Sequence, residues 1–270
     1  MIISFNPIIP GDIFIWDKGC ITNSLLHKIK NAKAIILSQT VSPELYYLAK
    51  SSCAKVFPNY DYRFKWQGKI GDTLLFWHFG VKHPNTWIFP KVEAFIGDHP
   101  EMGYKHPKLK FPYVIKANKG GEGSSIYLIE NEGQLKDVLA LLRKMEWQGR
   151  AGFVAQEFIP DINKDLRVVV IGDYITSYWR NSSGFHKNIA KGGIIDKTSE
   201  SELQEIGRKT VKKFCAKTGI NLAGFDLIFP PQKNEPLFIE INYTFGRCGL
   251  GGSEKFYKIL KEQVKRFLEP

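Results

Sequence analysis

The chain has 270 residues, of which 43% are apolar and 24% charged, and its formal net charge is +11 at pH 7. This composition allows a folded core and excludes a largely disordered chain. A basic chain favours anionic partners: nucleic acid, an acidic membrane surface or a phosphorylated small molecule. The lysines are scattered without a block of five or six, which argues against a nucleic-acid arm.

Cysteine spacing and the N-terminal sequence indicate a cytoplasmic protein. The four cysteines (Cys20, Cys53, Cys215 and Cys248) form no C-x-x-C pair, which is typical of reduced thiols. The N-terminal MIISFNPIIPGD lacks a basic region followed by a long apolar run, so we expect no signal peptide. No apolar segment approaches the roughly 20 residues that span a bilayer.

Short strands and helices are predicted to alternate at the start of the chain. The runs DIFIWD (12–17) and AKAIILSQ (32–39) predict strands, and NSLLHKIK (23–30) predicts a helix between them. Ser42 is a good N-cap for a helix over 42–53.

A further helix is predicted over 67–80, ending at Gly80, and the chain then continues extended. We therefore expect a small α/β domain at residues 1–86, with a boundary near Thr86.

The remaining elements fall into two groups. In residues 87–160 the pattern predicts a strand at 112–118, a glycine-rich turn, a strand at 126–130, a helix at 132–145 and a strand at 152–159. In residues 161–270 it predicts strands at 165–172, 174–180, 224–229 and 237–242, and helices at 199–219 and 253–270. Strands outnumber crossover helices and pair locally, so we expect an α+β fold with mixed sheets.

The strand LFIEIN carries two polar residues in an apolar run. Alternation assigns Leu237, Ile239 and Ile241 to one face, and Phe238, Glu240 and Asn242 to the other.

The simplest hairpin with the preceding strand pairs Phe229 with Leu237 and sets Asp226 directly opposite Glu240. Opposed residues have Cβ atoms about 4.5–5.5 Å apart, so two like charges there are destabilising unless a cation lies between them. Two carboxylates and the Asn242 amide are hard oxygen ligands of the kind that Mg²⁺ prefers. The alternative is that Asp226 caps a turn in solvent and that Glu240 is an ordinary edge-strand charge.

A lysine precedes a glycine-rich turn in VIKANKGGEGSSIYL. Lys116 lies on the strand, and Gly120, Gly121 and Gly123 let backbone amides approach an anion. The turn is not a Walker loop, because no G-K-[ST] follows it. Together with a magnesium site, it points to a nucleoside triphosphate, although glycine-rich hairpins are also common structural turns.

Seven segments in order resemble the ATP-grasp superfamily, and within it the RimK-type glutamate ligases and glutathione synthetases. They are FPYVIK, the glycine-rich loop, VAQEFIP, DLRVVVIGD, KNIAKGG, AGFDLIF and FIEIN. The resemblance covers the chain from Trp87 onward. It implies an ATP-grasp fold, with two α+β subdomains (87–160 and 161–270) that grip the nucleotide behind the small α/β domain (1–86).

The resemblance implies a nucleotide site. Its residues would be Lys116, the flap with Gly120, Gly121 and Gly123, the hinge residues Glu157 and Phe158, Asp165 near the ribose, and Lys187 and Asn188 near the phosphates.

The resemblance also implies a metal site and two catalytic arginines. Asp226, Glu240 and Asn242 match the family's metal ligands, the same three oxygens that the hairpin argument selects. Arg167 would lie near the acceptor carboxylate and Arg180 near the γ-phosphate.

Two departures from the family pattern concern the substrate side. Phe245 stands where relatives have a proline, in NYTFG, and His186-Lys187-Asn188 replaces an Arg-Ser-Asn triplet. The ammonium of Lys is a point charge and the guanidinium of Arg is a planar fork, so the geometry at His186-Lys187-Asn188 differs from that of the family's triplet.

The activity implied is an ATP- and Mg²⁺- or Mn²⁺-dependent ligase. It would join a carboxylate to an amine or thiol through an acylphosphate, on an amino acid or a peptide. The expected partners are ATP, a small acid and an amine, with no membrane. The oligomeric state stays open, a homo-oligomer included.

Two other functions remain as alternatives. One is an ATP-grasp kinase, whose product would be a phosphoester; the other is a non-catalytic module that binds nucleotide or RNA. Aromatics interleave with Arg63, Lys65 and Lys69 in PNYDYRFKWQGK, a pattern that could stack single-stranded nucleic acid but that we interpret as core packing.

Overall fold

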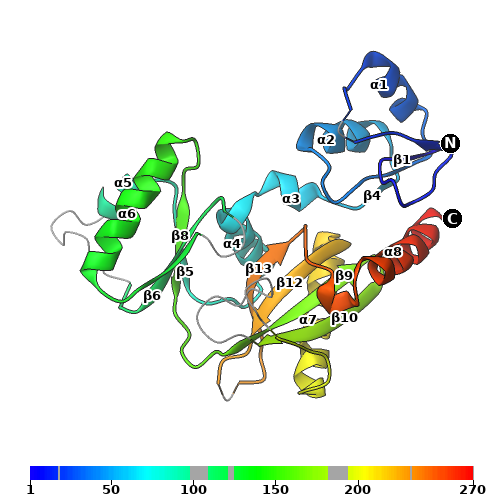
Figure 1. Ribbon diagram of the computed structural model, residues 1–270. Coiled ribbons are helices and arrows are strands. Elements are labelled where there is room, and N and C mark those ends of the chain that lie inside the picture. Colours follow the sequence, from blue (N-terminus) through cyan, green and yellow to red (C-terminus); the bar gives the residue numbers. More distant parts are fainter. Residues whose placement is uncertain (18, 98–108, 121–124, 182–193, 232, 270) are drawn as a thin grey trace.

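The computed structural model describes residues 1–17, 19–97, 109–120, 125–181, 194–231 and 233–269. Within these ranges the strands form one parallel sheet and two antiparallel sheets, and the two chain termini lie at the same end of the molecule (Figure 1). Helices cover the sheet faces, as expected for an α+β fold. No helix in these ranges combines the length and the apolar character that crossing a membrane requires.

The N-terminal sheet is parallel and has the strand order β2-β1-β3-β4. Its elements are β1 (Ile2–Ser4), β2 (Ile13–Phe14), α1 (Asn23–Lys30), β3 (Ala34–Ile36), α2 (Pro43–Ser52) and β4 (Val56–Phe57). The predicted N-cap is confirmed, because the Ser42 side chain accepts a hydrogen bond from the Leu45 amide. Strands β1 and β4 were not predicted from the sequence.

Two helices lead from this sheet to the next, α3 (Asp61–Lys65) and α4 (Gly68–Phe79). Helix α4 ends as predicted at Gly80, whose φ of 62° lies in the left-handed region that glycine adopts without steric cost. In Figure 1, α4 lies between the two antiparallel sheets.

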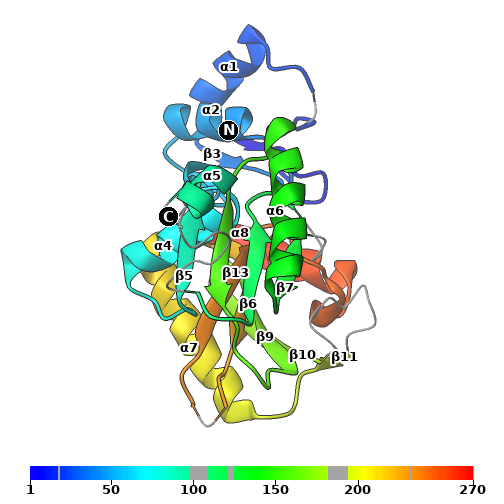
Figure 2. The same ribbon diagram turned by 90° about the vertical axis from the view of Figure 1, so that its left-hand side faces the viewer.

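The second sheet is antiparallel with the order β5-β8-β6-β7. Its elements are β5 (Thr86–Phe89), α5 (Val92–Gly97), β6 (Tyr113–Ala117), β7 (Ile126–Ile129), α6 (Glu132–Trp147) and β8 (Phe153–Glu157). Helix α6 lies across one face of this sheet (Figure 2), where Leu135, Leu139 and Leu142 join the sheet in one core.

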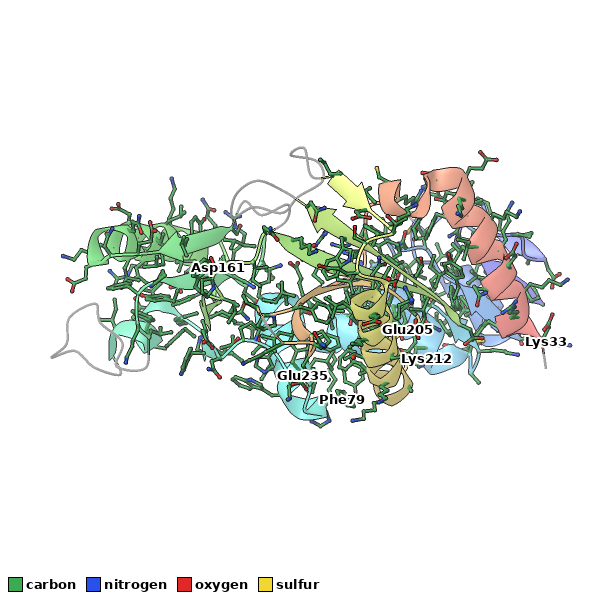
Figure 3. All side chains as sticks on the ribbon, turned by 90° about the horizontal axis from the view of Figure 1, so that it is seen from below. Lys33, Phe79, Asp161, Glu205, Lys212 and Glu235 are labelled. Atoms are coloured by element: carbon green, nitrogen blue, oxygen red, sulfur yellow. The ribbon has the colours of Figure 1, made fainter. Side chains whose placement is uncertain are left out.

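The third sheet is antiparallel with the order β11-β10-β9-β12-β13. Its elements are β9 (Lys164–Ile171), β10 (Tyr174–Asn181), β11 (Ile194–Asp196), α7 (Ser201–Thr218), β12 (Leu222–Ile228), β13 (Leu237–Asn242), the short 3₁₀ helix η3 (Cys248–Leu250) and α8 (Ser253–Leu268). Figure 3 shows α7, marked by Glu205 and Lys212, against this sheet.

Both faces of the third sheet are covered by apolar side chains. In β9, Leu166 and Val168 belong to the core beneath α7, whereas Val169 and Ile171 belong to a core shared with α8 and the N-terminal sheet. Successive side chains of a strand point to opposite faces of the sheet, so the valines and the isoleucine of the run RVVVI supply apolar side chains to both faces. Arg167 therefore lies on the same face as Val169.

The hairpin of β12 and β13 confirms one predicted pair and corrects another. Asp226 lies opposite Glu240, as predicted, but Leu237 pairs with Ile228 and not with Phe229, because the register shifts between these pairs. The extra residue of such a bulge reverses the alternation of side chains. Phe238 consequently lies with Ile241 in the core beneath α7, and the prediction that it shares a face with Glu240 is wrong.

The N-terminal sheet is not an isolated body. Phe5 and Phe57 lie in the same apolar core as Phe256 and Leu260 of α8, so the two ends of the chain are packed together. The domain boundaries expected at residues 86/87 and 160/161 remain predictions.

Gly249 should be essential to the fit of the loop that follows β13. A Cβ at this position would lie 2.0–2.5 Å from atoms of the buried Tyr178 ring, whereas a Cβ at Gly246 in the same loop would meet nothing within 4 Å. Gly249→Ala should therefore lower the free energy of unfolding by about 1–3 kcal/mol, the usual cost of overpacking. Gly246→Ala is the matched control and should unfold at the same urea concentration as the wild type.

Candidate functional site

One face of the third sheet gathers charged side chains from three adjacent strands. Asp165 and Arg167 come from β9, Arg180 from β10 and Asp226 from β12. The registers place Asp165 opposite Arg180 and Arg167 opposite Asp226. Because side chains alternate along a strand, all four side chains point to the face of the sheet that carries Val169 and Ile171. They lie beyond the part of this face that α8 covers.

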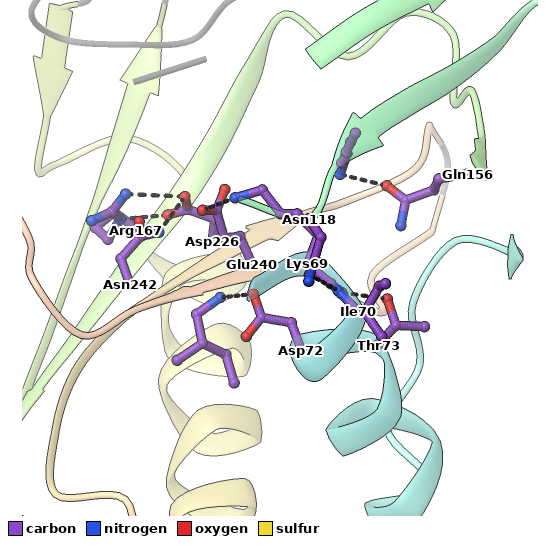
Figure 4. A network of polar contacts seen from close by, with 12 residues as sticks. Lys69, Ile70, Asp72, Thr73, Asn118, Gln156, Arg167, Asp226, Glu240 and Asn242 are labelled. Atoms are coloured by element: carbon purple, nitrogen blue, oxygen red, sulfur yellow. Dashed lines mark hydrogen bonds and ion pairs between the residues drawn. The ribbon is translucent and has the colours of Figure 1, made fainter. Parts of the chain in front are cut away.

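The centre of this face is the carboxylate of Asp226, which is 6% exposed. Arg167 binds it through two nitrogens, with its Nη2 at 3.0 Å from Oδ2 (Figure 4). The Nη2 of Arg180 lies 2.9 Å from Oδ1, and the Nδ2 of Asn242 donates to Oδ2 at 3.1 Å. Arg180 also binds Asp165 at 2.7 and 2.8 Å, so it bridges two acids.

These contacts keep Asp226 ionised although it is buried. Burial by itself would raise the pKa of its carboxyl, but the charges of Arg167 and Arg180 outweigh burial and hold that pKa below its ordinary value. For Arg180, burial acts against the charged form, and Asp226 and Asp165 outweigh it, so its pKa lies above the ordinary value.

Glu240 binds a cation from a different part of the chain. It forms an ion pair with Lys69 of α4, and the two side chains are 24% and 13% exposed (Figure 4). The facing acids predicted in the hairpin therefore exist, but protein side chains compensate them: arginines for Asp226 and a lysine for Glu240. The two acids therefore do not require a divalent ion between them, and the prediction that they do is wrong.

Asp72 brings a third carboxyl group to this region. Its Oδ2 accepts a hydrogen bond of 3.2 Å from the amide of Ile241, between Glu240 and Asn242 (Figure 4). Removal from water, followed by the negative charge of Glu240, raises the pKa of Asp72 to about 8.

Lys116 faces this region from the second sheet. It is 7% exposed, and its Nζ donates to Oε1 of Gln156 at 2.7 Å. Burial is the main cause that lowers the pKa of Lys116 to about 8, and the charge of Glu240 partly opposes that shift. Gln156 in turn donates to the Thr86 hydroxyl at 2.9 Å, so Lys116 is held through β8 to β5.

The other predicted nucleotide residues are described only in part. A Cβ on Gly120 would lie 2.1 Å from the Ser125 hydroxyl, which explains glycine at the start of the turn. Glu157 is exposed at the end of β8 and accepts a hydrogen bond of 2.8 Å from Asn85 Nδ2, and Phe158 beside it is half-buried. Gly121, Gly123, Lys187 and Asn188 lie outside the described residues.

The oxygen donors fit a magnesium ion in their chemistry. Asp226, Glu240 and Asn242 supply two carboxylates and an amide, and the register sets the two acids opposite each other. The two Asp226 oxygens already receive four hydrogen bonds or ion-pair contacts, so a metal would need one of them to give way. No group of three His, Cys, Asp or Glu side chains suited to a metal occurs among the described residues.

No sequence pattern indicated that Lys69, Asp72 and Gln156 belong to this region. Lys69 and Asp72 are three apart on α4 and so lie on one side of the helix, but this spacing indicates only a local pair. Nothing in the sequence connects that side with β13, about 170 positions later.

The basic and aromatic segment that leads into α4 packs against the protein core, and most of its side chains are only partly buried. Tyr60 is fully buried, and the Arg63 guanidinium lies 4.6 Å from its ring centroid and 5.8 Å from that of Tyr243. Lys69 binds Glu240. This arrangement agrees with the core-packing interpretation.

Asp72→Asn should reduce the pH dependence of stability. The folded protein keeps the Asp72 proton up to a pKa of about 8, whereas the ordinary value is 3.8. Between pH 3.8 and about pH 8, unfolding therefore releases this proton. The contribution of Asp72 to the free energy of unfolding consequently falls as the pH rises through this range. Asn keeps an acceptor for the Ile241 amide but cannot ionise.

Urea unfolding of both proteins at pH 5, 6, 7 and 8 measures this effect. The free energy of unfolding of the wild type should fall relative to that of Asp72→Asn at each step. A constant difference between the two proteins would contradict the assigned environment of Asp72.

The sequence is similar to known ligases over part of its length. It is 30% identical over 165 residues to a "Probable alpha-L-glutamate ligase" of Xanthomonas oryzae pv. oryzae, covering 57% of this chain and 53% of that protein. A protein of the same name from Xylella fastidiosa is 30% identical over 144 residues, covering 52% and 44%. The chain thus spans about half the length of these curated relatives.

Solved ATP-grasp proteins have a similar fold. A RimK domain protein from Sphaerobacter thermophilus superposes with a TM-score of 0.62 at 12% identity, over 97% of this chain and 98% of that one. A D-alanine–D-alanine ligase from Bacillus anthracis gives 0.60 at 17% identity, over 94% and 83%. The model of the RimK-like ATP-grasp domain matches residues 78–264, more than half of the chain. The chain belongs to the RimK-like ATP-grasp family.

Proposed function

We propose that the protein is an ATP- and Mg²⁺-dependent ligase that joins a carboxylate to an amine, on an amino acid or a peptide. Family membership supports ATP as the substrate, and the name of the relatives, alpha-L-glutamate ligase, supports an amino acid. The observation that carries the proposal is the charged face of the third sheet, where opposed acids lie among buried cations.

The nucleotide would bind between the second and third sheets. Lys116 would contact its phosphates or adenine, with Gly120 at the start of the flap and Glu157 and Phe158 at the adenine. Asp165 would lie on the ribose side. Gly121, Gly123, Lys187 and Asn188 would complete this site, as the family resemblance implies. Burial supports the role of Lys116, because a buried ammonium held by one amide oxygen attracts an anion strongly.

Asp226, Glu240 and Asn242 would hold Mg²⁺ or Mn²⁺. The metal would supply neutralisation of the phosphate oxygens during phosphoryl transfer. Arg180 would place its guanidinium at the γ-phosphoryl group, and Arg167 would orient the acceptor carboxylate. Both are fixed by buried ion pairs, so their charges are already oriented before substrates bind.

The reaction would proceed in two steps. A carboxylate oxygen attacks the γ-phosphorus, the bond to the β-phosphate oxygen breaks, and ADP leaves. The amine nitrogen then attacks the acyl carbon, the C–O bond to phosphate breaks, and the nitrogen loses a proton. No side-chain nucleophile is required, so the protein would act by positioning and charge neutralisation.

The proposed location of this enzyme is the cytoplasm, as the spacing of the four cysteines indicates.

Glu240→Gln should lower the rate of ADP release at least about tenfold, because it removes the charge of a metal ligand. The assay combines ATP, Mg²⁺ and mixtures of amino acids, with mass spectrometry of the products. The matched control is Glu235→Gln, which removes an exposed glutamate that pairs with Lys82 and should leave the rate unchanged.

The product distinguishes the possible activities. A condensed amide together with ADP and phosphate supports the ligase. A stable phosphoester would show a kinase instead, and unchanged turnover in Glu240→Gln would overturn the metal assignment.

A further inference from the structure

The ion pair between Lys69 and Glu240 joins α4 to the strand that carries two of the candidate metal ligands. The Nζ of Lys69 binds Oε1 of Glu240, and both side chains are largely removed from water. Glu240 lies opposite Asp226 in the register, so the ammonium binds one of the two acids that the proposed metal would share. The lysine therefore supplies positive charge at one ligand of the proposed metal site.

The backbone around Lys69 is held tightly. The amide of Lys69 donates to the Asn118 carbonyl at 3.3 Å, and the amide of Ile70 donates to Asn118 Oδ1 at 3.0 Å (Figure 4). Gly68 has a φ of +72°, and a Cβ on it would lie 2.2 Å from the Asn118 carbonyl oxygen. Asn118 follows β6, the strand of Lys116, so the start of α4 is attached to the second sheet. The backbone that carries Lys69 is thus held in place by the second sheet.

A second lysine–glutamate pair near β13 provides a comparison. Lys82 binds Glu235, but these side chains are 63% and 55% exposed. Water replaces such a contact easily, so exposed pairs contribute little. In the pair of Lys69 and Glu240, loss of the lysine leaves a carboxylate with little access to water, which is costly unless another cation takes its place.

We propose that Lys69 is a positioning residue that holds Glu240 in the metal-free protein and competes with the divalent cation for its carboxylate. This inference rests on the metal role of Glu240 proposed above. Cation binding then exchanges one positive partner of Glu240 for another. The released ammonium stays close to Asp72, which lies one helical turn along α4. The exchange thus connects metal occupancy to α4 and, through Asn118, to the second sheet.

The test measures binding of Mn²⁺ alone, without nucleotide, by calorimetry on the full chain. Lys69→Gln removes the competing charge, so it should bind Mn²⁺ about 5- to 150-fold more tightly than the wild type, the range of typical coupling between two ligands. The metal-free variant should melt at a lower temperature than the wild type, and Mn²⁺ should raise its melting temperature more. Equal or weaker Mn²⁺ binding by folded Lys69→Gln would overturn the inference.

Two further variants act as controls. Lys82→Gln removes the exposed pair and should leave both Mn²⁺ affinity and melting temperature unchanged. Lys69→Arg keeps the charge and should not bind Mn²⁺ more tightly than the wild type. If Lys69→Gln does not fold, Lys69→Met decides the question, because it also removes the charge, and Mn²⁺ binding no tighter than that of the wild type would contradict competition.

Failure of this inference can be distinguished from failure of the proposed function. If the wild type takes up Mn²⁺ with ATP, Glu240→Gln does not, and Lys69→Gln gains no affinity for Mn²⁺, only the exchange is wrong. If the wild type takes up neither Mn²⁺ nor its ATP complex, the metal site and the exchange are both wrong.

Discussion

The compensation of buried charge around Asp226 is the constraint on which the candidate site depends. Its carboxylate lies inside the third sheet and is balanced by Arg167 and Arg180, and Arg180 is balanced in turn by Asp165. A buried ion without a partner costs several kcal/mol, so these four side chains have to be present together. The same requirement fixes the register of β9, β10 and β12, because each of these strands contributes at least one of the four charged side chains.

A second set of charges lies where α4 meets β13. Glu240 and Lys69 form an ion pair, Asp72 accepts the Ile241 amide, and Lys116 approaches from the second sheet. Among the described strands, β13 is the edge of its sheet, where the Ile241 amide donates to Asp72 of α4 and the Phe238 amide donates to the Lys82 carbonyl. One helix thus connects the second and third sheets, between which the proposed nucleotide site lies.

Much of the fold could be predicted because its signals are local. The Ser42 cap, the end of α4 at Gly80 and the apolar run of β9 each depend on neighbouring residues. The pairing of Asp226 with Glu240 was also predictable, but the bulge beside it was not, and Phe238 consequently points into the opposite core. Propensities do not reveal where an extra residue is accommodated in a ladder, because that depends on packing against α7.

The sequence by itself determined the kinds of groups available: two acids and an amide at the end of a hairpin, a lysine before glycines, and the ordered segments of the RimK-like ATP-grasp family. The tertiary structure alone decided which charges meet. Lys69 and Glu240 are 171 positions apart, and Arg167 and Asp226 are 59 apart. Contacts at such separations arise from strand order and helix packing, whereas sequence patterns report only the face on which each side chain lies.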